Sequence, residues 1–217
     1  MKLILCSEGF STKGIIDKCV ELVGKPKDSI NVAVINEAYS VENNNLRWVL
    51  NNLNKVKDNF GGNLELVNLL ALSIQDIKER IEKSDVIFVL GGHTDYLMSV
   101  FNKSEFSKLL PEVLKSKVYV GSSAGSMVLG KRLSAQAYEK IYHEQSVYGI
   151  SKYLEFIDIT IMPHLDNPHF ANRREILQDA SRNHSGVIYG LRDDSAIVVK
   201  ENKITTIGSK PYILNKD

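Results

Sequence analysis

Residues 117–127 read Lys-Val-Tyr-Val-Gly-Ser-Ser-Ala-Gly-Ser-Met. The apolar run Val118–Val120 ends in Gly121, and small residues follow before a second apolar segment begins. This order predicts a buried strand, a tight turn and the start of a helix, with Ser123 at the turn. Glycine permits the sharp bend because a larger side chain would clash there, and the bend would expose the Ser123 hydroxyl at the end of the strand.

The spacing Gly121-x-Ser123-x-Gly125 is that of a nucleophile elbow, the turn that presents a catalytic serine. The same spacing also occurs where small residues only allow a helix to pack on a sheet. The five residues are therefore open to both interpretations, and the surrounding pattern has to decide between them.

Apolar strand patterns alternate with helical patterns over the first 120 residues or so. Strands are predicted over residues 3–6, 31–35, 64–70, 86–90 and 118–120, and helices over 12–23, 41–56, 74–81 and 94–101. Later strands are predicted over 157–162, 187–191, 196–199 and 203–207, with one helix over about 171–182. We expect an α/β fold: a doubly wound, mostly parallel sheet with helices on both faces and a short antiparallel C-terminal extension. No repeat or linker interrupts residues 1–217, so one domain is predicted.

The charge balance excludes some classes of partner. The chain of 217 residues has 27 basic and 26 acidic residues, and a broad nucleic-acid or membrane surface would need a basic excess. No apolar run approaches the length of a membrane span, and the N-terminus lacks the features of a signal peptide. Cys6 and Cys19 have no metal-ligand spacing and are interpreted as buried thiols. We expect a cytoplasmic protein with no cofactor and no nucleic-acid or membrane partner.

A serine nucleophile needs a base, which is usually histidine. His164 follows the predicted strand over 157–162, and Pro163 favours extended backbone just before it. His164 is therefore expected at the carboxyl edge of the sheet, where Ser123 is also expected and where ligands bind in such folds. His169 is the alternative base, and either histidine could instead be a solvated loop residue. His164, Asp166 and His169 could also bind zinc together with His93, but no second cluster has ligand spacing, so no metal site is predicted.

A serine hydrolase also needs donors to the oxyanion and an acidic residue beside the histidine. Gly91-Gly92 ends another strand, so the Gly92 amide and the Ala124 amide are candidate donors to an oxyanion. Glu139 is the predicted acid of the triad, with Glu144 as the next choice. Two further carboxylates, those of Asp158 and Asp166, flank the strand before His164.

Four segments together resemble the dipeptidase E and cyanophycinase family of serine peptidases. Gly91-Gly92-His93-Thr94 with Leu97 resembles the family's G-G-N-T-x-x-L block, and Gly121–Ser126 resembles its G-x-S-A-G-[AS] segment. Ile161–Asn167 resembles its I-x-P-H-F-x-N segment, and Gly190–Ala196 resembles its G-x-x-[DE]-x-[ST]-A segment. Four blocks in the same order are far more specific than any one of them.

The resemblance implies roles for individual residues. It implies that Ser123 is the nucleophile, that His164 is the base and that Gly92 and Ala124 supply the oxyanion amides. It also implies a fold related to the class I glutamine amidotransferases and a substrate that is a small, aspartate-containing peptide. Arg173 and Arg174 are then candidates for binding the substrate carboxylate, although both could be solvated helix residues.

The chain departs from the family pattern at two places. His93 replaces the asparagine of the first block, which would alter substrate contacts, and Tyr138 falls where the family's acid is expected, next to Glu139. The sequence thus favours a serine peptidase, active as a monomer or a homodimer. A non-peptide amidase on the same fold and an inactive binding or regulatory homologue remain as alternatives.

Overall fold

The computed structural model describes residues 1–43, 46–169 and 173–215. Its strands are β1 (Lys2–Cys6), β2 (Val32–Ile35), β3 (Leu64–Leu66), β4 (Val86–Val89), β5 (Val118–Ser122), β6 (Ile159–Met162), β7 (Val187–Gly190), β8 (Ala196–Lys200), β9 (Lys203–Ile207) and β10 (Tyr212–Leu214). Its α-helices are α1 (Lys13–Val23), α2 (Arg47–Asn59), α3 (Ile74–Glu82), α4 (Thr94–Lys103), α5 (Phe106–Val113), α6 (Ala124–Met127), α7 (Ala135–Tyr142) and α8 (Arg173–Ser181). Two 3-10 turns, η1 (Lys27–Ser29) and η2 (Glu37–Tyr39), follow α1 and β2.

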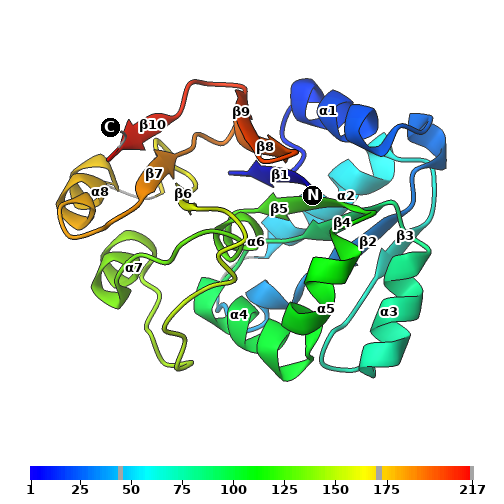
Figure 1. Cartoon of the computed structure of the whole chain (residues 1–217), viewed down its shortest axis with the longest axis horizontal. Helices are drawn as coiled ribbons and strands as arrows, with labels where there is room; N and C mark the ends of the chain where they lie inside the picture. Colours follow the sequence, from blue (N-terminus) through cyan, green and yellow to red (C-terminus); the bar gives the residue numbers. More distant parts are fainter. Residues whose placement is uncertain (44–45, 170–172, 216–217) are drawn as a thin grey trace.

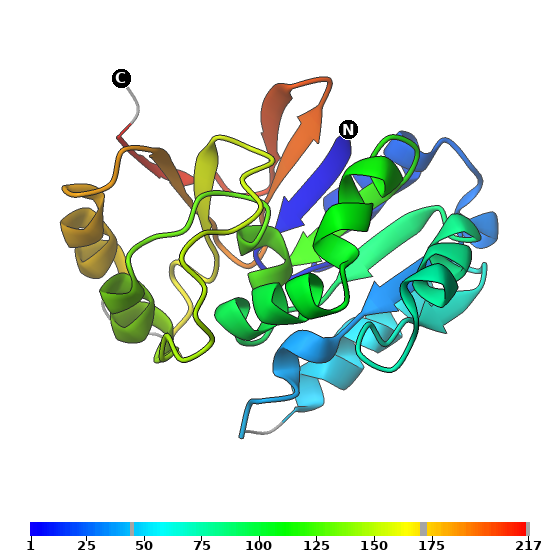
Figure 2. The same ribbon diagram turned by 60° about the horizontal axis from the view of Figure 1, so that its bottom comes forward.

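A large sheet forms the centre of the fold, with the strand order β3-β2-β4-β5-β1-β8-β9. The first five strands in this order are parallel to one another. β8 pairs antiparallel with β1, and β9 pairs antiparallel with β8. Helices lie on both faces of the sheet (Figures 1 and 2). This arrangement confirms the predicted α/β fold with a mostly parallel sheet and antiparallel C-terminal strands.

The core has two layers because successive side chains of a strand point to opposite faces. Leu3 and Leu5 of β1 pack with α3, α4 and α5 on one face, and Ile4 and Cys6 pack with α1 and α2 on the other. β4 reads Val-Ile-Phe-Val and is buried throughout, as expected for a parallel strand covered on both sides. Each fully buried aliphatic side chain of this kind contributes about 1.5–3 kcal/mol of transfer free energy.

A small sheet with the order β10-β7-β6 lies beside the large one, together with α7 and α8 (left in Figure 1). β6 and β7 pair in parallel, and β10 pairs antiparallel with β7. The sequence predicted these segments as part of an antiparallel extension. The difference arises because α8 returns the chain to the start of the sheet, as a parallel pair requires.

Several helix ends differ from their predicted positions. Thr12 caps α1, since its hydroxyl accepts from the Ile15 amide at 3.4 Å. His93 caps α4, because its Nδ1 atom accepts from the Tyr96 amide at 3.3 Å. The helices predicted over 41–56 and 171–182 include residues 44–45 and 171–172, which lie outside the described residues. Their described parts are α2 and α8.

The turn between β5 and α6 is tightly packed. Ser123 has φ +50° and ψ −115°, a conformation that costs a non-glycine residue free energy. The Ser123 amide donates to the carbonyl oxygens of Cys6 and Ser7, each at 3.1 Å, which anchors the turn to the end of β1. A Cβ added to Gly121 would lie 2.6 Å from backbone atoms of Gly125 and Ser126, so only glycine fits at residue 121.

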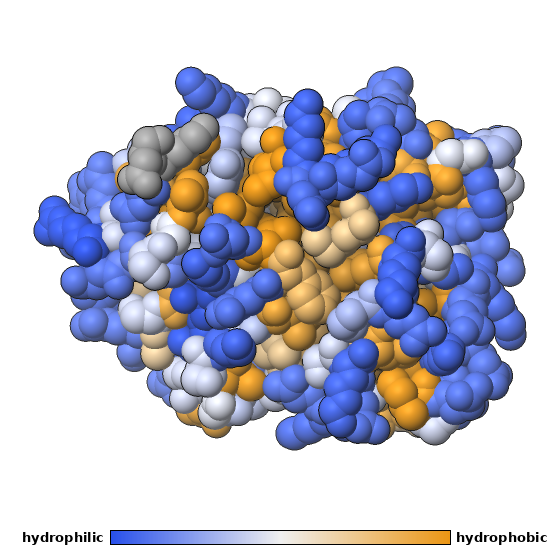
Figure 3. Space-filling model, viewed as in Figure 1, coloured by the Kyte–Doolittle hydropathy of each residue, from blue (hydrophilic) through white to orange (hydrophobic). Residues whose placement is uncertain are grey.

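The surface is mostly hydrophilic on the face drawn in Figure 3, and apolar residues show near its middle, close to the N-terminus. Met1, Pro111, Leu114 and Phe156 line a shallow apolar depression with Lys115. Among the described residues, no helix combines the length and the apolar character needed to cross a membrane.

We predict that Gly121→Ala lowers the free energy of unfolding by about 1–3 kcal/mol, because the new methyl group would meet the backbone of Gly125 and Ser126. Gly14→Ala is the matched control, since its new Cβ would lie 3.4 Å from Ile207 Cγ2, an ordinary contact. In the control the free energy of unfolding is expected to stay the same or to rise by up to about 1 kcal/mol. Urea unfolding measures both, and equal midpoints for the two variants would contradict the packing argument.

Candidate active site

The carboxyl ends of β1, β4 and β5 meet at one edge of the large sheet. Ser7 follows β1, Gly91-Gly92 follows β4 and Ser123 follows the last residue of β5. A Cβ added to Gly91 would lie 2.9 Å from Ser123 Cβ, so these loops are in contact. The predicted meeting of Gly91-Gly92 with Ser123 is therefore present in the structure.

Ser123 is partly exposed and begins the short helix α6. Within residues 1–43, 46–169 and 173–215, the Ser123 hydroxyl makes no hydrogen bond to the protein. Two amides of α6, those of Ser126 and Met127, donate to the Ser123 carbonyl at 2.8 and 3.0 Å. These bonds hold the backbone of the turn while the hydroxyl stays accessible.

The amides of Gly92 and Ala124 lie on the two loops that meet at Ser123. In the described part of the chain, neither amide donates to a protein acceptor. Gly92 has φ +130°, a conformation for glycine, and the amide of the next residue donates to the Ala38 carbonyl at 2.9 Å. The loop is thus pinned against η2 on one side and touches the Ser123 turn on the other.

His164 comes from the small sheet, two residues after β6. Its Nδ1 atom lies 2.5 Å from Asp193 Oδ1, and its backbone amide donates to Ser7 Oγ at 2.7 Å. Arg173 Nη1 donates to the carbonyl oxygens of Pro163 and His164 at 2.6 and 3.1 Å. His164 is thereby held from its ring, its amide and its carbonyl.

Asp193 is the carboxylate beside the imidazole, and sequence reasoning did not select it. It lies in the loop between β7 and β8, where Oδ1 accepts from Ser7 Oγ and Oδ2 accepts from Asn167 Nδ2, both at 2.8 Å. Partial burial raises the pKa of Asp193, but the hydrogen bonds from His164, Asn167 and Ser7 outweigh this and hold it well below its usual value. The group is therefore a carboxylate at neutral pH.

The prediction that Glu139 supports His164 is corrected by this geometry. Glu139 lies on the exposed face of α7, and it is Asp193 that contacts the ring. The signal for Asp193 was in the quoted segment Gly190–Ala196, whose pattern carries an acid at that position. Glu139 is close to Ser123 in sequence, whereas Asp193 is brought near His164 by the fold.

Glu144, the second choice for the acid, occupies a different site. Its carboxylate accepts from the Thr94 amide at 3.0 Å and from the Thr94 hydroxyl at 3.1 Å, at the start of α4. Burial raises the pKa of Glu144 to about 8 despite these two hydrogen bonds. His93 Nδ1 lies 3.5 Å away, and burial lowers the pKa of His93, so both groups favour their neutral forms.

The remaining predicted residues have partners outside this cluster. Arg174 makes a two-pronged contact with Asp166, at 3.0 and 2.9 Å, and Arg192 also donates to Asp166 at 2.5 Å. His169 is exposed, and its amide donates to Asn167. Asp158 pairs with Lys131. The described residues contain no group of three or more His, Cys, Asp or Glu side chains placed to hold a metal ion.

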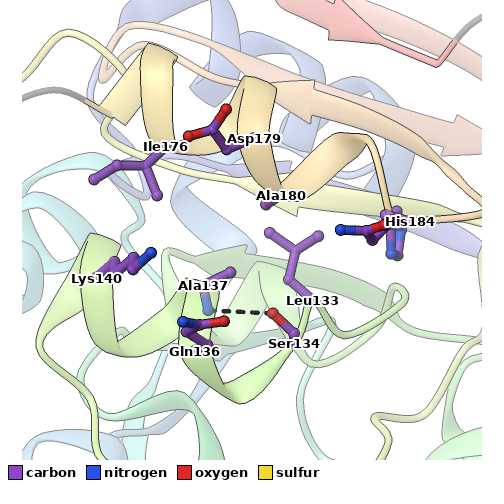
Figure 4. Close-up of a pocket in the computed structure, with 10 residues that line it drawn as sticks. Leu133, Ser134, Gln136, Ala137, Lys140, Ile176, Asp179, Ala180 and His184 are labelled. Atoms are coloured by element: carbon purple, nitrogen blue, oxygen red, sulfur yellow. Dashed lines mark hydrogen bonds between the residues drawn. The ribbon is translucent and has the colours of Figure 1, made fainter.

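A separate pocket lies between α7 and α8 (Figure 4). Ile176, Asp179 and Ala180 line it from α8, and Ala137 and Lys140 line it from α7. None of the residues that line it is Ser123, His164 or Asp193. The pocket therefore does not belong to the cluster at the strand ends.

Comparisons with known proteins agree with this picture. The sequence model of Peptidase family S51 matches residues 3–207. An uncharacterized peptidase of Listeria monocytogenes is 26% identical over 158 residues, which are 70% of this chain and 74% of that protein. Peptidase E of Haemophilus influenzae is 26% identical over 148 residues, 63% of this chain and 59% of the relative. Peptidase E of Shewanella oneidensis is 32% identical over 100 residues, 46% of this chain and 39% of the relative.

Solved structures share the fold. A Listeria monocytogenes protein provisionally named a peptidase E has a TM-score of 0.76 at 20% identity, covering 96% of this chain and 98% of its own. A peptidase from an acI-B1 Actinobacterium has a TM-score of 0.67 at 16% identity, covering 98% and 93% of the two chains.

We predict that the buried Glu144 makes stability depend on pH. Its pKa is 4.5 ordinarily and about 8 in the folded protein, so its contribution is fully present below pH 4.5 and is lost as the pH rises through 8. Relative to Glu144→Gln, the wild type should lose about 1–3 kcal/mol of unfolding free energy between about pH 5 and about pH 8. Urea unfolding over that range, with the exposed Glu139→Gln as control, tests this; a constant difference between wild type and Glu144→Gln would refute it.

Proposed function

Because the chain belongs to peptidase family S51 and is a peptidase of the serine type, we propose that it hydrolyses small, aspartate-containing peptides through an acyl-enzyme on Ser123. The observation that carries this proposal is the His164–Asp193 pair, which Ser7 ties to the Ser123 turn. A strained serine, an imidazole and a carboxylate are the parts that acyl transfer requires.

The proposed reaction begins with a proton transfer. A His164 ring that donates from Nδ1 to Asp193 carries its lone pair on Nε2, the atom that accepts the Ser123 proton. Ser123 Oγ attacks the scissile carbonyl, and the Gly92 and Ala124 amides donate to the oxyanion. His164 then protonates the leaving amine. Water attacks the acyl-enzyme in the second half, with His164 again as the base.

The hydroxyl and the imidazole are not yet hydrogen-bonded in the described structure. Catalytic hydrogen bonds are often long in the absence of substrate and shorten in the complex with it. Ser7 links both residues, because its hydroxyl accepts from the His164 amide and its carbonyl accepts from the Ser123 amide.

The acidic substrate class is supported by the arginines near the histidine loop. Arg174 and Arg192 both hold the carboxylate of Asp166, which shows that a carboxylate fits between two guanidinium groups there. We assign the substrate carboxylate to Arg174, with Asp166 displaced. Arg173 is 2% exposed and bonds the Pro163 and His164 carbonyls, so we assign it to positioning the base.

We expect the full chain to hydrolyse Asp-Leu faster than Asn-Leu, whose side-chain amide is an uncharged isostere, because only the side-chain carboxylate of Asp-Leu can pair with a guanidinium group. Ser123→Ala should lower kcat by at least about 10⁴-fold and abolish labelling by a fluorophosphonate probe. Equal rates of hydrolysis for the two dipeptides would contradict the proposed preference for acidic substrates. Undiminished hydrolysis by Ser123→Ala would contradict the assignment of Ser123 as the nucleophile.

The two candidate acids can be separated with one pair of variants. Asp193→Asn should lower kcat by about 10³–10⁴-fold, because an amide donor at that place favours the wrong imidazole tautomer. Glu139→Gln should leave kcat unchanged, since Glu139 is exposed on α7. Steady-state kinetics measures both, and the reverse order of effects would restore Glu139 as the acid.

A further inference from the structure

Ser7 lies at the centre of the proposed site, although neither its sequence context nor the Ser-His-acid scheme gives it a role. It follows β1 directly and is 0% exposed. Buried serine hydroxyls usually bond a nearby backbone carbonyl. The Ser7 hydroxyl instead contacts both His164 and Asp193, which are far from it in sequence.

The distances around the Ser7 hydroxyl favour one arrangement of its hydrogen bonds. A hydroxyl has a single proton, and the carboxylate oxygen of Asp193 at 2.8 Å can only accept it. The Leu191 carbonyl, at 3.4 Å, is the weaker of the two possible acceptors. The oxygen lone pair of Ser7 accepts from the His164 amide at 2.7 Å. One hydroxyl therefore orients the imidazole residue and its carboxylate partner together.

The backbone of Ser7 is equally constrained. Its amide donates to the Ser195 carbonyl at 3.1 Å, and its carbonyl accepts from the Ser123 amide at 3.1 Å. The hydroxyl therefore projects from a backbone that is itself bonded to the nucleophile turn. Ser123, His164 and Asp193 share no other residue that contacts all three among the hydrogen bonds of the described residues.

We propose that Ser7 is a positioning residue of the peptidase reaction, whose hydroxyl holds the His164–Asp193 pair at the distance and orientation that the Ser123 hydroxyl requires. The inference rests on the proposed Ser123–His164–Asp193 mechanism. Ser7 touches no reacting atom. Its effect is expected on kcat, because geometry sets the rate of proton transfer, whereas the contacts that bind the peptide are elsewhere.

The test compares Ser7→Ala with Ser84→Ala in the full chain. Ser84 is also buried, and its hydroxyl donates to the Ile81 carbonyl at 2.7 Å, at the opposite end of the sheet. With the best-cleaved dipeptide, Ser7→Ala should lower kcat by about 10–100-fold and change KM by less than about 3-fold. The rate of fluorophosphonate labelling of Ser123 should fall in parallel. Ser84→Ala should keep the wild-type kcat and labelling rate.

The pH profile adds a readout that loosened packing would not move. The charged and titratable groups that interact with Asp193 are His164, Arg173 and Tyr142, and all three remain in the variant. A carboxylate with one donor fewer stabilises a protonated imidazole more strongly. The acid limb of the kcat/KM profile should therefore move to higher pH in Ser7→Ala.

Conservative variants extend the test in case Ser7→Ala does not fold. Ser7→Thr keeps the hydroxyl group. Ser7→Cys keeps a side chain of similar size, but its thiol is a weak hydrogen-bond donor. A kcat at least about 5-fold higher for Ser7→Thr than for Ser7→Cys supports the proposal. Equal kcat values for these two variants, a folded Ser7→Ala with wild-type kcat, or an equal loss in Ser84→Ala would overturn it. The proposed function fails separately, if the wild type is not labelled or Ser123→Ala remains active.

Discussion

The position of β1 in the large sheet is the constraint on which the candidate site depends. β1 pairs in parallel with β5 and antiparallel with β8, so Cys6 lies opposite Ser122 on one side and Ala196 on the other. One step further along the chain, Ser7 is bonded to Ser123 and Ser195. A one-residue slip in this register would turn the β1 side chains to the opposite faces and separate Ser7 from Asp193. The register of β1 in the sheet thus sets the geometry of the candidate site.

The junction between the two sheets supplies the other half of the site. The Leu191 amide donates to the Met162 carbonyl at 2.8 Å, and the Leu165 amide donates to the Leu191 carbonyl at 2.9 Å. These bonds hold the loop of His164 against the segment that leaves β7 for β8. Asp193 lies on that segment, so its position is set by both sheets. The parallel pairing of β6 with β7 therefore brings the imidazole next to its carboxylate, because His164 follows β6 and Asp193 follows β7.

The surroundings of each carboxyl group decide its charge. Asp193 and Glu144 are both partly buried and both accept hydrogen bonds, yet their pKa values move in opposite directions. Asp193 accepts from an imidazole, a hydroxyl and an amide, and these together outweigh the cost of burial. Within the described part of the chain, the hydrogen bonds to the Glu144 carboxylate come from Thr94 alone, and the effect of burial on the pKa prevails. Asp193 is therefore a charged partner for His164, whereas Glu144 is a neutral group at the start of α4.

Local patterns along the chain were sufficient to predict the alternation of strands and helices, the tight turn at Ser123, the placement of His164 after a strand and the family. Hydrophobic periodicity, glycine positions and short motifs are local properties, so they can be read without coordinates. Three contacts became apparent only in the folded chain. Asp193 and not Glu139 faces His164, Arg173 donates to the Pro163 carbonyl, and the Ser7 hydroxyl contacts both His164 and Asp193. These contacts join segments far apart in the chain, and a linear pattern holds no distances between such segments. The pairing of β1 with β5 and β8 brings them together.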